Sequence, residues 1–374
     1  MKIKFIKILS VCFFLFILYS FTTKTTAKKH KETIKVALLL DTSNSMDGLI
    51  NQAKTQLWEI VNKLSKAKYG NQKPNLEIAL YEYGNSSLAI SDGYIRKVLA
   101  FSSDLDLISE KLFSLKTNGG SEYCGQVIKT SIDELSWGKN KNDLRLIFIA
   151  GNEPFTQGKI NYKEAIAQAK EKDVVINTIY CGKYQVGINT KWEDGASIGG
   201  GDYMNIDQDK KIVHIVTPYD RDIIILNKKL NKTYIYYGTK GRTKQLNQVE
   251  QDNNAKELNE AVYVKRTISK GSNLYKNSSW DLVDAEKYNK VDYSKINKKN
   301  LPKHLKNKSV SEIKAYVKEQ AKKRKEIQLK IKELDNKRSI FIAKKMKESP
   351  KGNILENAII NTIKKQAIKK NYSW

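Results

Sequence analysis

Between residues 34 and 206, short apolar runs alternate with longer stretches in which apolar residues recur every three or four positions. The runs predict buried strands and the stretches predict amphipathic helices, because side chains repeat every two residues in a strand and every 3.6 in a helix. This alternation indicates an α/β fold with a doubly wound, mostly parallel sheet and helices on both faces. Strands are expected at 34–40, 76–83, 144–150, 174–180 and 203–206, with an edge strand at 93–101.

The pattern weakens after residue 206. Thr217 and Pro218 suit the start of a helix that runs to about Leu230 and that we expect to dock on the sheet domain. Residues 238–300 are polar and weakly periodic, which predicts a surface-hugging or partly mobile connector. A sheet domain at 34–237 followed by a polar connector at 238–300 is the resulting division.

Residues 301–374 predict an α-helical C-terminal region. A long charged helix is expected at 309–347, and a second amphipathic helix at 354–368. Polar residues interrupt the near-heptad spacing of the first helix, so we favour a helical hairpin over a coiled-coil dimer.

The N-terminus carries an export signal in its pattern. Three lysines precede an apolar run at 8–21, and small and polar residues follow up to Ala27. This layout predicts a signal peptide at 1–27, because the run is short for a membrane span. The protein is therefore expected to be exported and to be periplasmic, envelope-associated or secreted, which disfavours nucleic acid as a partner.

The net charge of the 374-residue chain is +27. Such a charge can attract anionic polymers or membranes, but a composition rich in Lys, Asn and Ile produces it as well. We favour the compositional explanation because no compact basic motif stands out in the sequence.

The first predicted strand ends in an acid followed by two hydroxyls. Asp41, Ser43 and Ser45 come directly after it, at the sheet edge where open α/β sheets bind ligands. One carboxylate and two hydroxyls form an all-oxygen cluster, which suits a hard divalent cation such as Mg²⁺.

The Asp-x-Ser-x-Ser pattern resembles the first part of the metal-ion-dependent adhesion site (MIDAS) of von Willebrand factor A domains, over roughly residues 34–231. The resemblance implies a second ligand segment at Gly119-Gly120-Ser121 and a third near residues 150–154. Gly151 stands where the family carries an acid, and Glu153, two residues later, is the expected replacement; Asn152, Glu122 and Asp47 are further donors nearby. The predicted metal ligands are Asp41, Ser43, Ser45, Ser121 and Glu153.

The resemblance also implies a function. A Mg²⁺ or Mn²⁺ ion would keep one coordination position open for an acidic side chain, Asp or Glu, of a protein partner. The chain is thus expected to be a non-enzymatic adhesion-type protein. The alternative is a metal-free structural envelope protein that holds to anionic surface polymers through its basic helices.

Other chemistry finds little support. Haloacid dehalogenase-type phosphotransfer needs Asp-x-Asp, but position 43 is serine, and the chain has three histidines, with no clustered Cys and His for zinc. Cys124 and Cys181 both fall near the predicted ligand-binding edge and can pair in an oxidising compartment; the alternative is two small buried hydrophobic residues.

Overall fold

The computed structural model describes residues 31–207, 215–348 and 354–374. Six strands make one sheet in the order β4-β3-β1-β5-β6-β7, and every neighbouring pair is parallel except the antiparallel pair β3 and β4. The doubly wound, mostly parallel sheet is therefore confirmed. The strands are β1 (Thr33–Asp41), β3 (Asn75–Tyr83), β4 (Ile95–Ser102), β5 (Leu144–Gly151), β6 (Val174–Cys181) and β7 (Gly200–Ile206).

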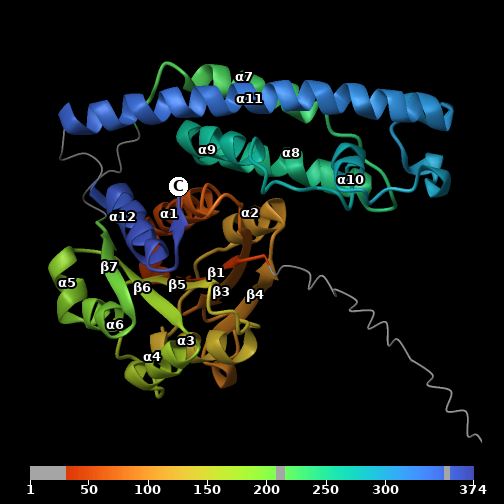
Figure 1. The fold of residues 1–374 in the computed structure, drawn as a ribbon. Helices are drawn as coiled ribbons and strands as arrows, with labels where there is room; N and C mark the ends of the chain where they lie inside the picture. The colour runs from red at the N-terminus through yellow and green to blue at the C-terminus, as the bar shows by residue number, and fades with distance from the viewer. Residues whose placement is uncertain (1–30, 208–214, 349–353) are drawn as a thin grey trace, which may run out of the picture. The chain divides into compact units, whose positions relative to one another are not determined.

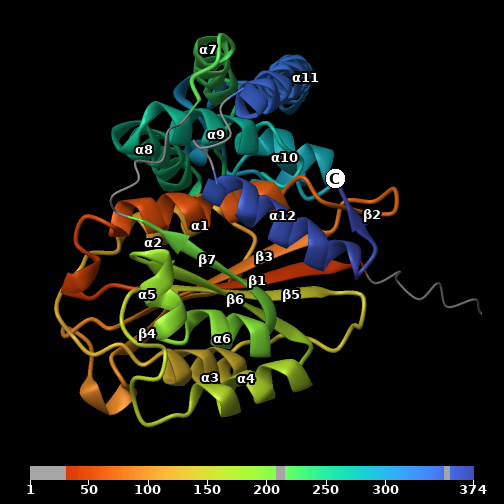
Figure 2. The same cartoon turned by 90° about the vertical axis from the view of Figure 1, so that its left-hand side faces the viewer.

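Helices cover both faces of this sheet (Figure 2). Alternate residues of β1 enter two separate apolar cores, Val36 and Leu38 on one side and Ala37 and Leu39 on the other. This alternation follows from the two-residue period of a strand. The first core lies under α1 (Ile50–Leu64), α2 (Leu105–Ser114) and α12 (Ile354–Ile368). The second lies under α3 (Cys124–Glu134), α4 (Tyr162–Glu171) and α6 (Trp192–Ile198).

Residues 217–348, which we call the helical insertion, pack together beside α1 and α2 (Figure 1). The expectation of a polar connector at 238–300 is wrong, because three helices fill most of this stretch and bury side chains such as Val264 and Trp280. The helices are α7 (Asp220–Asn231), α8 (Gly241–Leu258), α9 (Glu260–Lys270), α10 (Leu282–Lys287) and α11 (Val310–Glu348).

Two expected helix packings also differ from the structure. The helix after Pro218, α7, packs on α9 and α11 instead of the sheet. The predicted hairpin of the last two long helices does not form, because α12 packs on α1 and β7 while α11 packs on α7, α9 and α10. The chain thus leaves the sheet domain after β7 and returns to it at α12.

The end of the chain secures this return. A short strand, β8 (Tyr372–Ser373), pairs antiparallel with β2 (Lys68–Tyr69), and the Tyr372 hydroxyl donates to the carbonyl of Asn142 at 2.9 Å. The sheet domain is therefore discontinuous in sequence, with residues 354–374 completing it. This replaces the division that assigned 34–237 to the sheet domain and 301–374 to a separate helical region.

Buried ion pairs hold the helical insertion to the sheet domain. Arg266 of α9 contacts Asp106 of α2 and Asp252 of α8, each at 2.7 Å, and all three side chains are buried. Lys270 contacts Asp252 at 2.6 Å. A buried charge is tolerated only when it is paired and hydrogen-bonded, so these contacts define the packing of α9.

The predicted signal peptide at 1–27 lies outside the described residues. Within the described ranges, no helix has both the length and the apolar character needed to cross a membrane.

Candidate metal centre

The loop that follows β1 is organised by its own acid. The Ser43 amide donates to Asp41 Oδ1 at 2.8 Å, a turn that Asp favours because its side chain can accept from the backbone two residues on. The Thr42 amide donates to the carbonyl of Tyr83 at 2.9 Å, which ties the loop to the end of β3. Met46 is fully buried and anchors the far side of the loop. The strand end and these contacts position Asp41 and the serines.

Three side-chain oxygens near Asp41 are joined by successive hydrogen bonds. Ser43 Oγ lies 2.8 Å from Ser45 Oγ, and the Ser45 hydroxyl donates to Asn152 Oδ1 at 2.9 Å. The Asn152 amide group donates back to the Ser45 carbonyl at 2.9 Å. Adjacent ligands of octahedral Mg²⁺, each about 2.0–2.1 Å from the ion, lie about 2.9 Å apart. The separations from Ser43 Oγ to Ser45 Oγ and from Ser45 Oγ to Asn152 Oδ1 are therefore compatible with adjacent ligands of one Mg²⁺ ion.

One oxygen of the Asp41 carboxyl group is buried without a hydrogen-bond donor among the described residues. Its side chain is fully buried, and Asp41 Oδ2 has no hydrogen-bond partner among the described residues. The pKa of Asp41 is raised to about 7, mainly because the carboxyl group is buried. The charge of Glu122 contributes to this rise, and hydrogen bonds from Ser43 oppose it. A buried carboxylate oxygen without a partner is costly, and a bound cation would remove this cost.

The second acid of the site is Glu122. A Cβ atom built on Gly84 would lie 2.8 Å from both Asp41 Oδ1 and Glu122 Cγ, so the two carboxyl side chains flank the same glycine. Glu122 is buried; burial raises its pKa, the Ser43 hydroxyl lowers it, and the charge of Glu153 raises it. The sequence placed Glu122 among the nearby donors but chose Glu153 as the main acid.

Glu153 and Ser121 occupy the adjoining loops. Both are partly exposed, and the Ser121 hydroxyl makes no hydrogen bond within the described part of the chain. Gly120 packs against the backbone of Gly84, and the Asn118 amide donates to the Thr42 carbonyl at 2.9 Å, which brings the second loop next to the first. The structure thus brings together Asp41, Ser43, Ser45, Glu122 and Asn152. Ser121 and Glu153 lie in adjoining loops, and their role as metal ligands stays a prediction.

Tyr83 explains the glycine at position 151. A Cβ atom on Gly151 would collide with the Tyr83 hydroxyl and would lie 3.1 Å from Asp41 Oδ2. Tyr83 is buried, and its hydroxyl donates to the Ala150 carbonyl at 3.0 Å. An acidic side chain at position 151 therefore has no room. No signal in the sequence alone links Tyr83 to this position.

The donor set fits a hard cation. In the described ranges no three His, Cys, Asp or Glu side chains gather in a way that could hold a metal ion, so an ion here would also need hydroxyl and amide oxygens. Asp41 and Glu122 would supply negative charge, while Ser43, Ser45 and Asn152 would supply neutral oxygens. Such a set favours Mg²⁺ or Mn²⁺ over metals that prefer sulfur or imidazole.

The predicted pairing of Cys124 and Cys181 is not present. Among the described residues both cysteines are free and buried. Cys124 belongs to the core on the α3 side of the sheet and Cys181 to the core on the α1 side, so the sheet itself separates them. They act as small hydrophobic residues.

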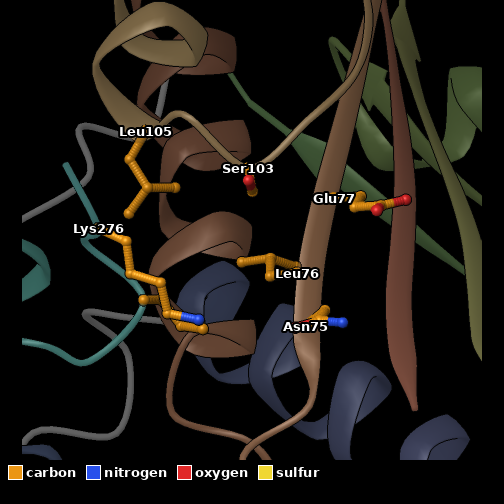
Figure 3. A pocket seen from close by; sticks show the side chains of 7 residues that line it. Asn75, Leu76, Glu77, Ser103, Leu105 and Lys276 are labelled. Atoms are coloured by element: carbon orange, nitrogen blue, oxygen red, sulfur yellow. The ribbon is translucent and has the colours of Figure 1, made fainter. Parts of the chain in front are cut away.

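A cavity of about 270 Å³ lies away from this cluster, between the start of β3, the β4–α2 connection and the segment after α9. Leu76, Leu105 and Lys276 point into it, whereas Glu77 points away (Figure 3) and pairs with Lys35 at 3.5 Å. None of its lining residues belongs to the candidate metal centre.

The fold and the oxygen cluster define a class of protein. Residues 35–200 match the family described as the von Willebrand factor type A domain. This part of the chain is therefore a von Willebrand factor type A domain, as the Asp-x-Ser-x-Ser motif predicts.

Solved structures of other proteins are also similar. BatB from Bacteroides thetaiotaomicron is 17% identical over 46% of this chain and 90% of its own, with a TM-score of 0.34. The VWA domain of SpRpn10 is 17% identical over 48% of this chain and 89% of its own, with a TM-score of 0.36. Proximal thread matrix protein 1 from the mussel byssus, with a zinc-occupied MIDAS motif, is 13% identical over 48% of this chain and 43% of its own, with a TM-score of 0.33. No curated protein matches the chain.

Proposed function

We propose that this protein is an exported, non-enzymatic binding protein whose type A domain holds one divalent cation, Mg²⁺ or Mn²⁺, and uses it to bind an acidic side chain of a protein partner. The observation that carries the proposal is the buried Asp41 carboxyl group with its unpartnered Oδ2, beside hydroxyl and amide oxygens at octahedral spacing.

Each residue has a defined task in this proposal. Asp41 and Glu122 balance the charge of the cation, and Ser43, Ser45 and Asn152 offer oxygens to it. A partner can approach the cluster from the side of Ser45 and Asn152, because the hydrogen bond between these two side chains lies at the protein surface. When bound, the cation supplies a positive charge that attracts a carboxylate.

A capture experiment tests this function. The immobilised protein is incubated with envelope extract in Mg²⁺ and then in chelator. Asp41→Asn keeps the shape of the side chain but removes its charge, whereas Asp92→Asn removes an exposed charge from the loop after β3. Wild type and Asp92→Asn should retain a partner that chelator releases, and Asp41→Asn should retain none.

Thermal unfolding of the same three proteins separates metal binding from partner binding. A ligand at 100 times its dissociation constant adds about 2.7 kcal/mol of stability. Wild type and Asp92→Asn should become more stable in Mg²⁺ or Mn²⁺, and Asp41→Asn should not. An unchanged wild-type transition would favour the metal-free structural alternative.

A further inference from the structure

The positive charge of this chain is confined to part of the fold. Residues 31–206, which form most of the sheet domain, contain 21 basic and 21 acidic side chains, so their net charge is zero. Residues 217–348, the helical insertion, contain 33 basic and 16 acidic side chains. A general lysine-rich composition would raise the charge of both parts. The difference therefore points to a role for the insertion's charge.

The charge is densest in one segment of the insertion. Residues 286–318, which we call the basic lobe, contain ten lysines, three acids and no arginine. All ten lysines are exposed: Lys287, Lys290, Lys295, Lys298, Lys299, Lys303, Lys306, Lys308, Lys314 and Lys318. The lobe runs from the end of α10 to the first turns of α11 (Figure 1).

The lobe has a defined backbone. Leu301 and Leu305 are buried against Ile313 and Val317 of α11, in a small apolar cluster of their own. Three short turns of 3-10 helix precede or include these leucines and carry four of the lysines, at Tyr293–Lys295, Lys298–Asn300 and Lys303–Leu305. The positive side chains are therefore displayed from a folded support.

Half of these lysines have an ammonium group without a polar partner in the described part of the chain. The ammonium groups of Lys290, Lys299, Lys303, Lys306 and Lys318 have neither an ion-pair nor a hydrogen-bond partner in the described part of the chain. Two further lysines of the lobe do have acidic partners, since Lys295 pairs with Asp292 and Lys308 pairs with Glu312. Ten lysines against three acids nevertheless leave the lobe with a net charge of +7.

The chemistry of the lobe indicates the kind of anion. Lysine is a hydrated point charge without the planar fork that lets arginine recognise a single phosphate or base. Aromatic rings of the lobe are engaged already, since Lys276 and Lys287 lie over Tyr288, and His304 packs edge-on against Tyr316. No ring is left to stack on nucleic-acid bases. Ten exposed lysines spread over one folded segment instead suit a broad surface of fixed negative charge.

We propose that the basic lobe binds the surface of an anionic phospholipid membrane by electrostatic attraction, independently of the metal centre. Each lysine near such a surface strengthens binding by roughly fivefold, and the attraction falls off within a Debye length. The lobe would hold the protein at the membrane while the type A domain remains available to its partner.

Vesicle sedimentation tests the proposal with the chain from residue 28 onward, which contains the sheet domain and the helical insertion. The vesicles contain phosphatidylcholine alone or phosphatidylcholine mixed with phosphatidylglycerol. The lobe variant changes its five unpartnered lysines to Gln: Lys290, Lys299, Lys303, Lys306 and Lys318. The matched control changes five exposed lysines of the sheet domain to Gln: Lys139, Lys141, Lys159, Lys170 and Lys183.

The wild type should bind only the anionic vesicles and should dissociate at about 1 M salt. The lobe variant should bind on the order of 1,000-fold more weakly, because it lacks five lysines that each contribute roughly fivefold, and the control should stay within about threefold of the wild type. Asp41→Asn should bind vesicles as the wild type does, which separates this site from the metal centre. Equal losses in both five-lysine variants, wild-type binding to neutral vesicles, or retention on soluble polyphosphate without vesicle binding would overturn the proposal.

Discussion

The sheet domain and the helical insertion are stabilised in different ways. The strands of the sheet bury continuous apolar runs such as 36–40, and they carry equal numbers of basic and acidic side chains. The insertion buries four cations among its helices: Arg266, Lys270, Arg324 and Arg338. Each has an acidic partner within 3.0 Å. Among the described residues the sheet domain buries two cations, Lys54 and Arg145, so buried cations are more frequent in the insertion.

The difference predicts a response to acid. Glu59 of α1 pairs with Lys265 of α9 at 2.7 Å. Burial raises the pKa of Glu59 and of Asp252, but the charges of Lys265 beside Glu59, and of Lys270 and Arg266 beside Asp252, outweigh it and hold both pKa values at about 2. A lowered folded-state pKa contributes stability that is present above the unfolded value and is lost as the pH falls toward 2. Between pH 4.5 and 2 the free energy of unfolding should fall by on the order of 5 kcal/mol.

Urea unfolding at several pH values measures this loss. The double variant Glu59→Gln, Asp252→Asn lacks both groups and should show a flatter pH profile than the wild type. If the two profiles run in parallel, these pairs do not link the insertion's stability to pH.

Removing one buried cation should have the next largest effect. Arg266→Met leaves Asp106 and Asp252 buried without their arginine, which should cost about 3–5 kcal/mol. Lys323→Met breaks an exposed pair with Glu319 and should cost far less, because water and salt screen that pair. Urea unfolding of both variants makes the comparison. Similar losses would mean that the buried pair is no more important than the surface pair.

A change within the sheet domain should have a smaller effect. Gly151→Asp restores the acid that the family carries, but it collides with the Tyr83 hydroxyl and should cost about 1–3 kcal/mol. In a Tyr83→Ala background the same substitution should cost less, because the hydroxyl is gone and only the close approach to Asp41 remains. The two costs, measured by thermal unfolding, form a double-mutant cycle. An equal cost in both backgrounds would show that Tyr83 does not exclude the acid.

The sequence predicted most of the sheet domain because its signals are local. The apolar run before Asp41 and the hydroxyls after it indicate a strand end with a ligand cluster, and the structure has both. The insertion escaped prediction because α8 buries Gln248, Gln251 and Asp252. Gln251, for example, accepts a hydrogen bond from Ser109, 142 positions earlier in the chain, and no local pattern can reveal such a partner.

The candidate site was predicted in part for the same reason. Asp41, Ser43 and Ser45 lie in one short segment, so their spacing alone indicated a cluster. Asn152 and Glu122 enter it through contacts between separate loops, and Glu122 is recognisable only once Gly84 is seen to lie between it and Asp41. The sequence left open whether Cys124 and Cys181 pair, because it does not show on which face of the sheet each cysteine lies.

The most direct test of the account is a calorimetric titration of the metal-free protein with Mn²⁺, performed on wild type, Asp41→Asn and Asp92→Asn. The account predicts one bound ion per chain in wild type and Asp92→Asn, and no binding in Asp41→Asn. An ion that binds Asp41→Asn as tightly as wild type, or no binding to the wild type, would contradict it.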